Sequence, residues 1–208
     1  QAANSLLKVL EEPPASAVFI LTAASPHSLL STILSRCWHL AFQPLKSDEL
    51  YQYLLGKGHD PVKASVATRL SGGRLGAAMA LLTADGLAAR DRALEIAAAL
   101  PDAGAEYIEE TAAALDKLDV AGFGEVLANL AGVLRDVLIM LTGREDLIFN
   151  VDIGPKLQAM TPGWNQSRLF KALEYVRQAE IALKTNANTR LVCEALLINL
   201  SDLVKEGY

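Results

Sequence analysis

The sequence predicts a mainly helical protein with a small α/β part at its N-terminal end. Three observations lead to this fold class. Residues 1–44 alternate helical and strand-like patterns, residues 45–84 hold three short amphipathic segments joined by glycines, and residues 85–208 show only helical periodicity. We therefore expect the C-terminal portion of an α/β domain, a three-helix domain and an all-α helical bundle, in that order.

The N-terminal part has the pattern helix, strand, helix, strand. Its first helix stops at "PP", because proline lacks the amide donor and restricts the residue before it. The apolar, β-branched run over 16–24 is typical of a buried strand. A helix is predicted over 25–35, with Ser25 as its N-cap and Pro26 at its first position. Alternation in "CWHLAF", residues 37–42, predicts a second strand.

The three-helix part is predicted from its caps and glycines. Ser47 and Asp60 are in position to cap helices over 48–58 and 61–73, and a third helix follows over 73–84. Short amphipathic helices with glycine-containing joints are typical of a small bundle.

The C-terminal part carries long helical patterns over 123–143, 166–186 and 187–207. Four residues form a broad apolar side of the last helix: Leu191, Ala195, Ile198 and Leu203. We expect this side to bury against its own bundle or against a partner helix. Trp38 and Trp164 are expected to be packing residues.

Composition excludes several classes of protein. The 208 residues are 51% apolar and 21% charged, which is too apolar for a disordered chain and sufficient for one or two cores. No stretch reaches the roughly 18 apolar residues of a membrane span, so we expect a soluble, cytoplasmic protein with no membrane association. Because the sequence opens inside a helical pattern without a start methionine, we also expect a fragment whose upstream part is missing.

Charge is unevenly distributed along the chain. Residues 1–84 carry seven Lys or Arg against five Asp or Glu, whereas residues 85–208 carry twelve against nineteen. Long-range attraction to phosphate backbones therefore favours the first part. Glu11 and Glu12 are adjacent, so we expect a solvated helix terminus there and not an acid/base pair.

No metal site or disulfide is expected. Cys37 and Cys193 are far apart in the sequence, and the three histidines lack the spacing of a metal motif. We therefore expect two reduced thiols and no bound metal.

Arg36 stands in "ILSRCWHL", between a predicted helix and a predicted strand. The residue pattern leaves two roles open. Arg36 ties the helix end to its surroundings, since a cation near a helix C-terminus is favourable without any partner, or it acts on a neighbouring molecule. The flanking Ser35 and Cys37 are expected to hold the shape of this junction and not to perform chemistry.

A resemblance adds to this interpretation. "AANSLLKVLEEPP", an apolar run and "SPHSLLSTILSRC" together resemble the stretch after the Walker B segment in clamp-loader ATPase subunits of the AAA+ class. "NANTRLVCEALLINL" is similar to the last collar helix of the same family. The resemblance implies the C-terminal part of an AAA+ α/β domain over 1–44, a three-helix lid over 45–84 and a helical collar for oligomerisation over 85–208.

The same resemblance implies a role for Arg36. In this family the subunits sit in an arc, and an arginine of one subunit reaches the γ-phosphate that its neighbour binds. Arg36 matches this arginine finger, for which a planar, fixed cation is better suited than lysine. The resemblance implies that ATP and Mg²⁺ are bound by the neighbouring subunit, and that this fragment binds no cofactor.

Three positions depart from the ATP-hydrolysing relatives. Ala23 and Ala24 stand where those relatives carry the polar sensor 1 residue, and Gly76 stands where they carry the sensor 2 arginine. A glycine has no side chain to contact phosphate, and Arg74 is two positions away on a different helical face. The resemblance therefore implies a subunit of the DNA polymerase III clamp loader that does not hydrolyse ATP.

The implied partners are the gamma or tau ATPase subunits and the delta subunit, with the sliding clamp and primer-template DNA reached through the assembled complex. Two other functions remain open. An ATP-hydrolysing, gamma- or tau-like subunit would be an enzyme, and an intact upstream phosphate-binding loop would favour it. A helical scaffold unrelated to DNA would fail to co-purify with clamp-loader partners.

Overall fold

A computed structural model describes residues 7, 9–11, 13–14, 16–23, 25–185 and 187–205. The chain divides into two compact units, Gln1–Gln43 and Pro44–Tyr208, called here the first and second units. Helices are the regular elements of the described residues, which contain no β-strand. The mainly helical fold class is therefore confirmed, whereas the predicted boundaries at 44 and 84 stay predictions.

The first unit contains η1, a 3-10 turn over Pro26–Ser28, and α2, a short helix over Ser31–Leu34. Ser25 caps η1 as predicted, because its side chain accepts a hydrogen bond from the backbone N–H two residues later at 3.2 Å. The single helix predicted over 25–35 is wrong. Leu30 separates the two turns with an extended backbone, φ −64° and ψ 139°.

The two predicted strands, over 16–24 and 37–42, are wrong. The described residues of both segments form no ladder of backbone hydrogen bonds. A strand requires a neighbour that pairs with its N–H and C=O groups, and no described segment supplies one. For the same reason Trp38 is 100% exposed, so its predicted packing role is also wrong. Trp164 is buried in the second unit, as predicted.

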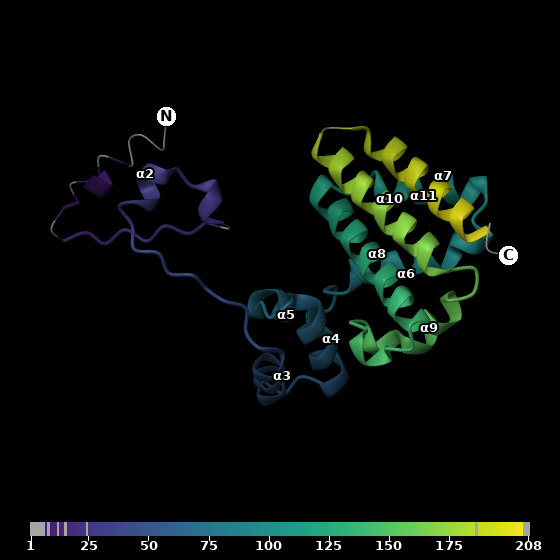
Figure 1. The fold of residues 1–208 in the computed structure, drawn as a ribbon, viewed down its shortest axis with the longest axis horizontal. Coiled ribbons are helices and arrows are strands. Elements are labelled where there is room, and N and C mark those ends of the chain that lie inside the picture. Colours follow the sequence, from purple (N-terminus) through teal and green to yellow (C-terminus); the bar gives the residue numbers. More distant parts are fainter. Residues whose placement is uncertain are drawn as a thin grey trace. The chain divides into compact units, whose positions relative to one another are not determined.

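The second unit begins with three short helices: α3 over Ser47–Gly56, α4 over Pro61–Ser71 and α5 over Leu75–Leu81. Figure 1 shows them as a group that precedes the larger bundle in the chain. Five fully buried residues form their shared core: Leu50, Leu54, Ala64, Ala67 and Ala78. The predicted three-helix arrangement is therefore present.

The caps of these helices follow the sequence in part. Asp60 caps α4 as predicted, because its carboxylate accepts hydrogen bonds from Val62 N at 2.9 Å and Lys63 N at 3.0 Å. Ser47 does not cap α3 but is its first residue. The cap position belongs to Lys46, whose backbone N–H donates to the Glu49 carboxylate at 3.4 Å.

Two glycines end α4 and turn the chain toward α5. Gly72 has φ +58° and Gly73 has φ +79°, in the left-handed region that favours glycine. A Cβ atom on Gly73 would overlap the Leu45 carbonyl oxygen and lie 2.8 Å from the Cβ atom of Pro44. Leu45 N also donates to the Gly73 carbonyl at 2.8 Å. Only glycine therefore fits where the end of α4 meets the segment that enters α3.

Replacing Gly73 with alanine should lower the free energy of unfolding by roughly 1–3 kcal/mol, because the new methyl group needs both a strained φ and a backbone shift. Gly76→Ala is the matched control. Gly76 lies within α5 with open space around it, so alanine there should raise stability by about 0.5–1 kcal/mol. Urea denaturation of the two variants should thus give shifts of opposite sign, and shifts of the same sign would contradict this packing.

The rest of the second unit is a helical bundle. Its helices are α6 over Ala88–Ala99, α7 over Ala105–Leu115, α8 over Val120–Leu141, α9 over Gly154–Met160, α10 over Gln166–Lys184 and α11 over Thr189–Lys205. Its 3-10 turns are η2 over Leu100–Asp102, η3 over Glu145–Leu147 and η4 over Val151–Ile153. The three long helices predicted from periodicity are confirmed as α8, α10 and α11. Helices α8 and α10 lie side by side (Figure 1).

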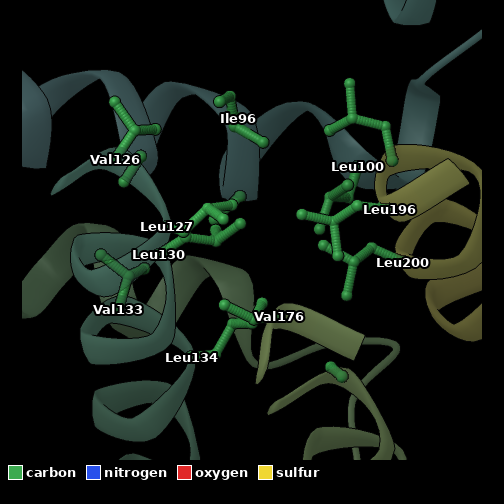
Figure 2. Close-up of a cluster of buried hydrophobic side chains, with 14 of the residues drawn as sticks. Ile96, Leu100, Val126, Leu127, Leu130, Val133, Leu134, Val176, Leu196 and Leu200 are labelled. Atoms are coloured by element: carbon green, nitrogen blue, oxygen red, sulfur yellow. The ribbon is translucent and has the colours of Figure 1, made fainter. Parts of the chain in front are cut away.

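The core of the bundle joins helices that are distant in sequence. Figure 2 shows Ile96 of α6, Leu127 and Leu130 of α8, and Leu196 and Leu200 of α11 directed toward one another. All five are at least 96% buried. Burial of an aliphatic side chain of this size contributes about 1.5–3 kcal/mol, so this core holds the long helices in a fixed arrangement.

A buried carboxylate fixes the segment that follows α8. Asp136 is fully buried and accepts hydrogen bonds from Phe149 N at 2.9 Å and from Asn150 N and Nδ2, both at 2.8 Å. Arg135 also pairs with it, with Nη1 at 2.7 Å from Oδ1. A buried charge is tolerated only with such partners, so these donors bind the segment tightly to α8.

Two arginines attach neighbouring helices to this segment. Arg69 of α4 donates from Nη1 to the carbonyl oxygens of Asp146 at 2.9 Å and Ile148 at 2.6 Å. Arg90 of α6 is buried and pairs with the Asp152 carboxylate at 2.8 Å. The segment between α8 and α9 therefore connects the three short helices with the bundle.

Candidate functional site

The candidate site lies at the C-terminal end of α2. Backbone N–H groups that follow this four-residue helix pair with the carbonyls of Ser31, Ile33 and Leu34, whereas the Thr32 carbonyl accepts hydrogen bonds from side chains. The Ser35 hydroxyl donates to the Thr32 carbonyl at 3.1 Å, and Nε2 of His39 lies 2.8 Å from the Leu34 carbonyl oxygen. Polar side chains therefore gather around this helix end.

Arg36 makes three contacts at the same place. Its Nη1 donates to the Thr32 carbonyl at 2.9 Å and to the Ser35 hydroxyl at 3.3 Å. Its Nη2 pairs with the Glu11 carboxylate at 2.5 Å. The structural role that the residue pattern left open is therefore present, because the guanidinium group supports the end of α2.

These contacts leave part of the guanidinium group available. The Arg36 side chain is 36% exposed and that of Glu11 is 49% exposed. A guanidinium group carries five N–H donors. Nη1 makes both hydrogen bonds and Nη2 makes the ion pair, so Nε–H is the donor without a partner among the described residues. A partly exposed cation with a free donor can bind an oxygen anion from outside the chain.

The residues predicted to mark lost catalytic functions lie in both units. Ala23, in the first unit, is exposed and has no polar side-chain atom, whereas Ala24 is outside the described residues. Gly76 lies in α5 of the second unit. Arg74 precedes it, and its Nε donates to the Ser71 carbonyl at 2.9 Å, so Arg74 supports the end of α4.

The two cysteines differ in their surroundings. Both are free, with Cys37 partly exposed beside Arg36 and Cys193 buried within α11. Burial raises the pKa of the Cys193 thiol to about 12, and the Glu194 carboxylate adds to this effect. Cys193 is therefore a packing residue, since only the thiolate is an effective nucleophile.

Alkylation should separate the two thiols. At pH 8 iodoacetamide should modify Cys37 in the folded protein, while Cys193 stays protonated and shielded until the protein is unfolded. Mass spectrometry of the labelled peptides measures this difference. Equal labelling of both residues under native conditions would contradict the burial of Cys193.

Two other kinds of site are not found in the described part of the chain. No group of three or more His, Cys, Asp or Glu side chains there is arranged to hold a metal ion. None of its helices has both the length and the apolar character needed to cross a membrane.

Helix α11 exposes part of its predicted apolar side. Leu191 is 64% and Ile198 is 47% exposed, and Ala195 between them is exposed as well. These three residues are called here the α11 stripe. Leu203 departs from the prediction, because it is buried in the core of the bundle. The predicted apolar side is therefore divided between a buried face and an exposed stripe.

A groove runs beside the α11 stripe. It has a volume of about 470 Å³ and lies between α7 and α11, with Ile108 and Ile198 among its apolar lining residues. Arg190 spans one part of it, pairing with Glu109 of α7 at 3.2 Å and with Glu194 at 2.9 Å. An apolar strip with charged borders is typical of a surface that binds another protein.

Sequence reasoning missed two important carboxylates. Glu11 pairs with Arg36, although its position predicted only a solvated helix terminus, and no local pattern indicates a partner 25 positions away. Asp136 left a clearer signal, because it interrupts the buried run that includes Val133 and Val137. A carboxylate at a core position of an amphipathic helix indicates a buried polar network.

Comparison with known families gives two matches. Residues 1–46, which contain Glu11 and Arg36, match the family described as DNA polymerase III, delta subunit. Residues 96–202 match the family described as DNA polymerase III, delta subunit, C terminal. The candidate site and most of the helical bundle thus fall within matched regions.

Individual relatives agree with these matches. The chain is 31% identical to DNA polymerase III subunit delta' of Escherichia coli (strain K12) over 212 residues, which cover 99% of this chain and 61% of that protein. It is 26% identical to DNA polymerase III subunit delta' of Bacillus subtilis (strain 168) over 213 residues, which cover 97% of this chain and 62% of that protein. The chain therefore spans about three fifths of the length of these relatives. A shorter stretch of 49 residues is 45% identical to DNA polymerase III subunit tau of Bacillus subtilis (strain 168). It covers 24% of this chain and 9% of that protein.

Proposed function

The chain belongs to the DNA polymerase III delta subunit family, and from this premise we propose that it acts as a delta'-type subunit of a clamp loader. It assembles with gamma- or tau-type ATPase subunits and a delta subunit, and the complex opens the sliding clamp and loads it onto primed DNA. The observation that carries this proposal is the match of both the Arg36 segment and the helical bundle to the same subunit family.

Within this complex Arg36 serves the ATP site of a neighbouring subunit. Hydrolysis joins a water oxygen to the γ-phosphorus, breaks the bond to the bridging oxygen and yields ADP and inorganic phosphate. Negative charge on the transferring oxygens is stabilised by a guanidinium group with free donors, which is unchanged by the reaction. The partial exposure of Arg36 and its free Nε–H donor support this role. ATP and Mg²⁺ are bound by the neighbour in this proposal.

Arg36→Ala tests the role directly. In full-length protein reconstituted with its ATPase partners, the neighbouring site should lose about 10³–10⁵-fold in rate, and total hydrolysis should fall by that site's share. Arg36→Lys retains the charge but not the planar fork, so it should restore little activity. Steady-state ATP hydrolysis and size-exclusion chromatography measure rate and assembly. Full activity of the assembled Arg36→Ala complex would refute the proposed role.

We also propose that the chain does not hydrolyse ATP itself. Ala23 and Gly76 offer no polar side chain at the two sensor positions, and Arg74 is occupied by the Ser71 carbonyl. Open space surrounds Gly76, so packing alone does not require glycine there. These features support a subunit that contributes a cation to its neighbour's site and lacks the groups for its own.

An ATP-hydrolysing, tau-like subunit is the second candidate. The similarity of part of the chain to subunit tau of Bacillus subtilis favours it. The full-length protein, purified without partners, distinguishes the two functions. ATP turnover by the isolated protein would support the second candidate, and its absence, with hydrolysis only in the complex, would support the first. Family membership favours either one over a scaffold unrelated to DNA.

The α11 stripe is proposed to contact a neighbouring subunit. Its residues already lie outside the core, so they expose apolar surface that a helix of another chain would cover. The adjoining groove between α7 and α11 extends this surface. The helical bundle therefore acts as the collar of the proposed complex.

Charged substitutions on the stripe should weaken assembly without unfolding the protein. Leu191→Glu and Ile198→Glu should each raise the Kd for the partner subunits about tenfold or more, because a buried unpaired carboxylate costs over ~1.4 kcal/mol. Val120→Glu, at an exposed apolar position of α8, is the matched control and should leave Kd unchanged. Circular dichroism should show intact folding of all three variants. Unchanged Kd for both stripe variants would exclude this surface.

A further inference from the structure

Glu11 and Arg36 lie 25 positions apart in the sequence, yet their side chains meet at the end of α2. The contact joins Nη2 of Arg36 to Oε1 of Glu11. Two other contacts, to the Thr32 carbonyl and the Ser35 hydroxyl, hold Nη1. The guanidinium group is therefore restrained from two sides.

The pair contributes more to geometry than to stability. Both side chains are substantially exposed, and ion pairs of this kind are screened by water and salt. An unrestrained arginine side chain samples many rotamers. Holding it in the one rotamer that reaches a phosphate therefore costs conformational entropy. Restraint in advance of the reaction removes that cost, because a catalytic group acts best when it is already in position.

Among the three described contacts, only that with Glu11 joins opposite charges. Thr32 contributes a backbone carbonyl, and Ser35 a neutral hydroxyl at the longest of the three distances. Coulomb attraction between opposite charges, which neither of the two neutral acceptors provides, adds to the Glu11 contact. Glu11 is therefore the side chain whose replacement should most change the orientation of Arg36.

The pairing also determines which donors stay free. With Nη1 used by Thr32 and Ser35, and Nη2 paired with Glu11, Nε–H is the donor without a partner among the described residues. This donor can bind a phosphate oxygen while the other contacts of the guanidinium group are kept.

We propose that Glu11 is a positioning residue for Arg36, holding the guanidinium group so that its free Nε–H donor faces a phosphate oxygen of the neighbouring subunit. This inference rests on the proposed function of Arg36. Glu11 itself touches no substrate and transfers no proton.

Glu11→Gln, in full-length protein within the reconstituted complex, tests the inference. The change removes the charge and retains the shape of the side chain, so kcat of the neighbouring site should fall about tenfold through misorientation of Arg36. KM for ATP and complex assembly should stay unchanged, because the neighbour binds the nucleotide. Glu11→Asp keeps the charge on a shorter side chain and should restore part of the rate. Glu110→Gln removes the same charge from an exposed position of α7 and is the control.

A double-mutant cycle separates positioning from other effects. Once Arg36 is alanine, Glu11→Gln should change kcat no further. A further loss in that background would overturn the inference, as would a wild-type kcat for Glu11→Gln alone while Arg36→Ala is impaired. Full activity of Arg36→Ala would instead refute the proposed function itself, so the two failures are distinguishable.

Discussion

The arrangement of the second unit depends on one buried carboxylate, because its charge requires hydrogen-bond donors. Asp136 of α8 is buried against the segment that follows this helix. Burial of its charge is tolerated because backbone and side-chain N–H groups donate hydrogen bonds to the carboxylate. Those hydrogen bonds give the segment a fixed course. Two carbonyl groups of this segment accept hydrogen bonds from Arg69 of α4, so the three short helices are attached to the segment that Asp136 fixes.

Hydrogen-bond donors also fix the candidate site in the first unit. At the end of α2 the Thr32 carbonyl accepts hydrogen bonds from side chains, and the Arg36 guanidinium group is one of the donors. This contact uses part of a group that has five donors, so the structural role is compatible with the catalytic role proposed above. Glu11 adds a charged restraint from the preceding segment. In the proposed complex the cation is thus built into this chain, while its effect appears at the neighbour's ATP site.

The sequence predicted features that local chemistry determines and missed those that need a distant partner. The caps at Ser25 and Asp60 and the long helices follow from side chains and periodicity within a few residues. The segments over 16–24 and 37–42 have strand-like composition, but a strand also needs a neighbour, which composition does not supply. The resemblance around Arg36 implied an arginine finger, which stays a prediction, whereas the ion pair of Arg36 with Glu11 required the tertiary structure.

The most direct measurement of this role is a structure of the assembled full-length complex with a γ-phosphate analogue bound in the neighbouring ATP site. We predict that a free N–H donor of Arg36 lies about 2.7–3.2 Å from an oxygen of the analogue, while Nη1 still contacts the Thr32 carbonyl. A guanidinium group directed away from the analogue, beyond hydrogen-bond distance in the occupied site, would contradict it.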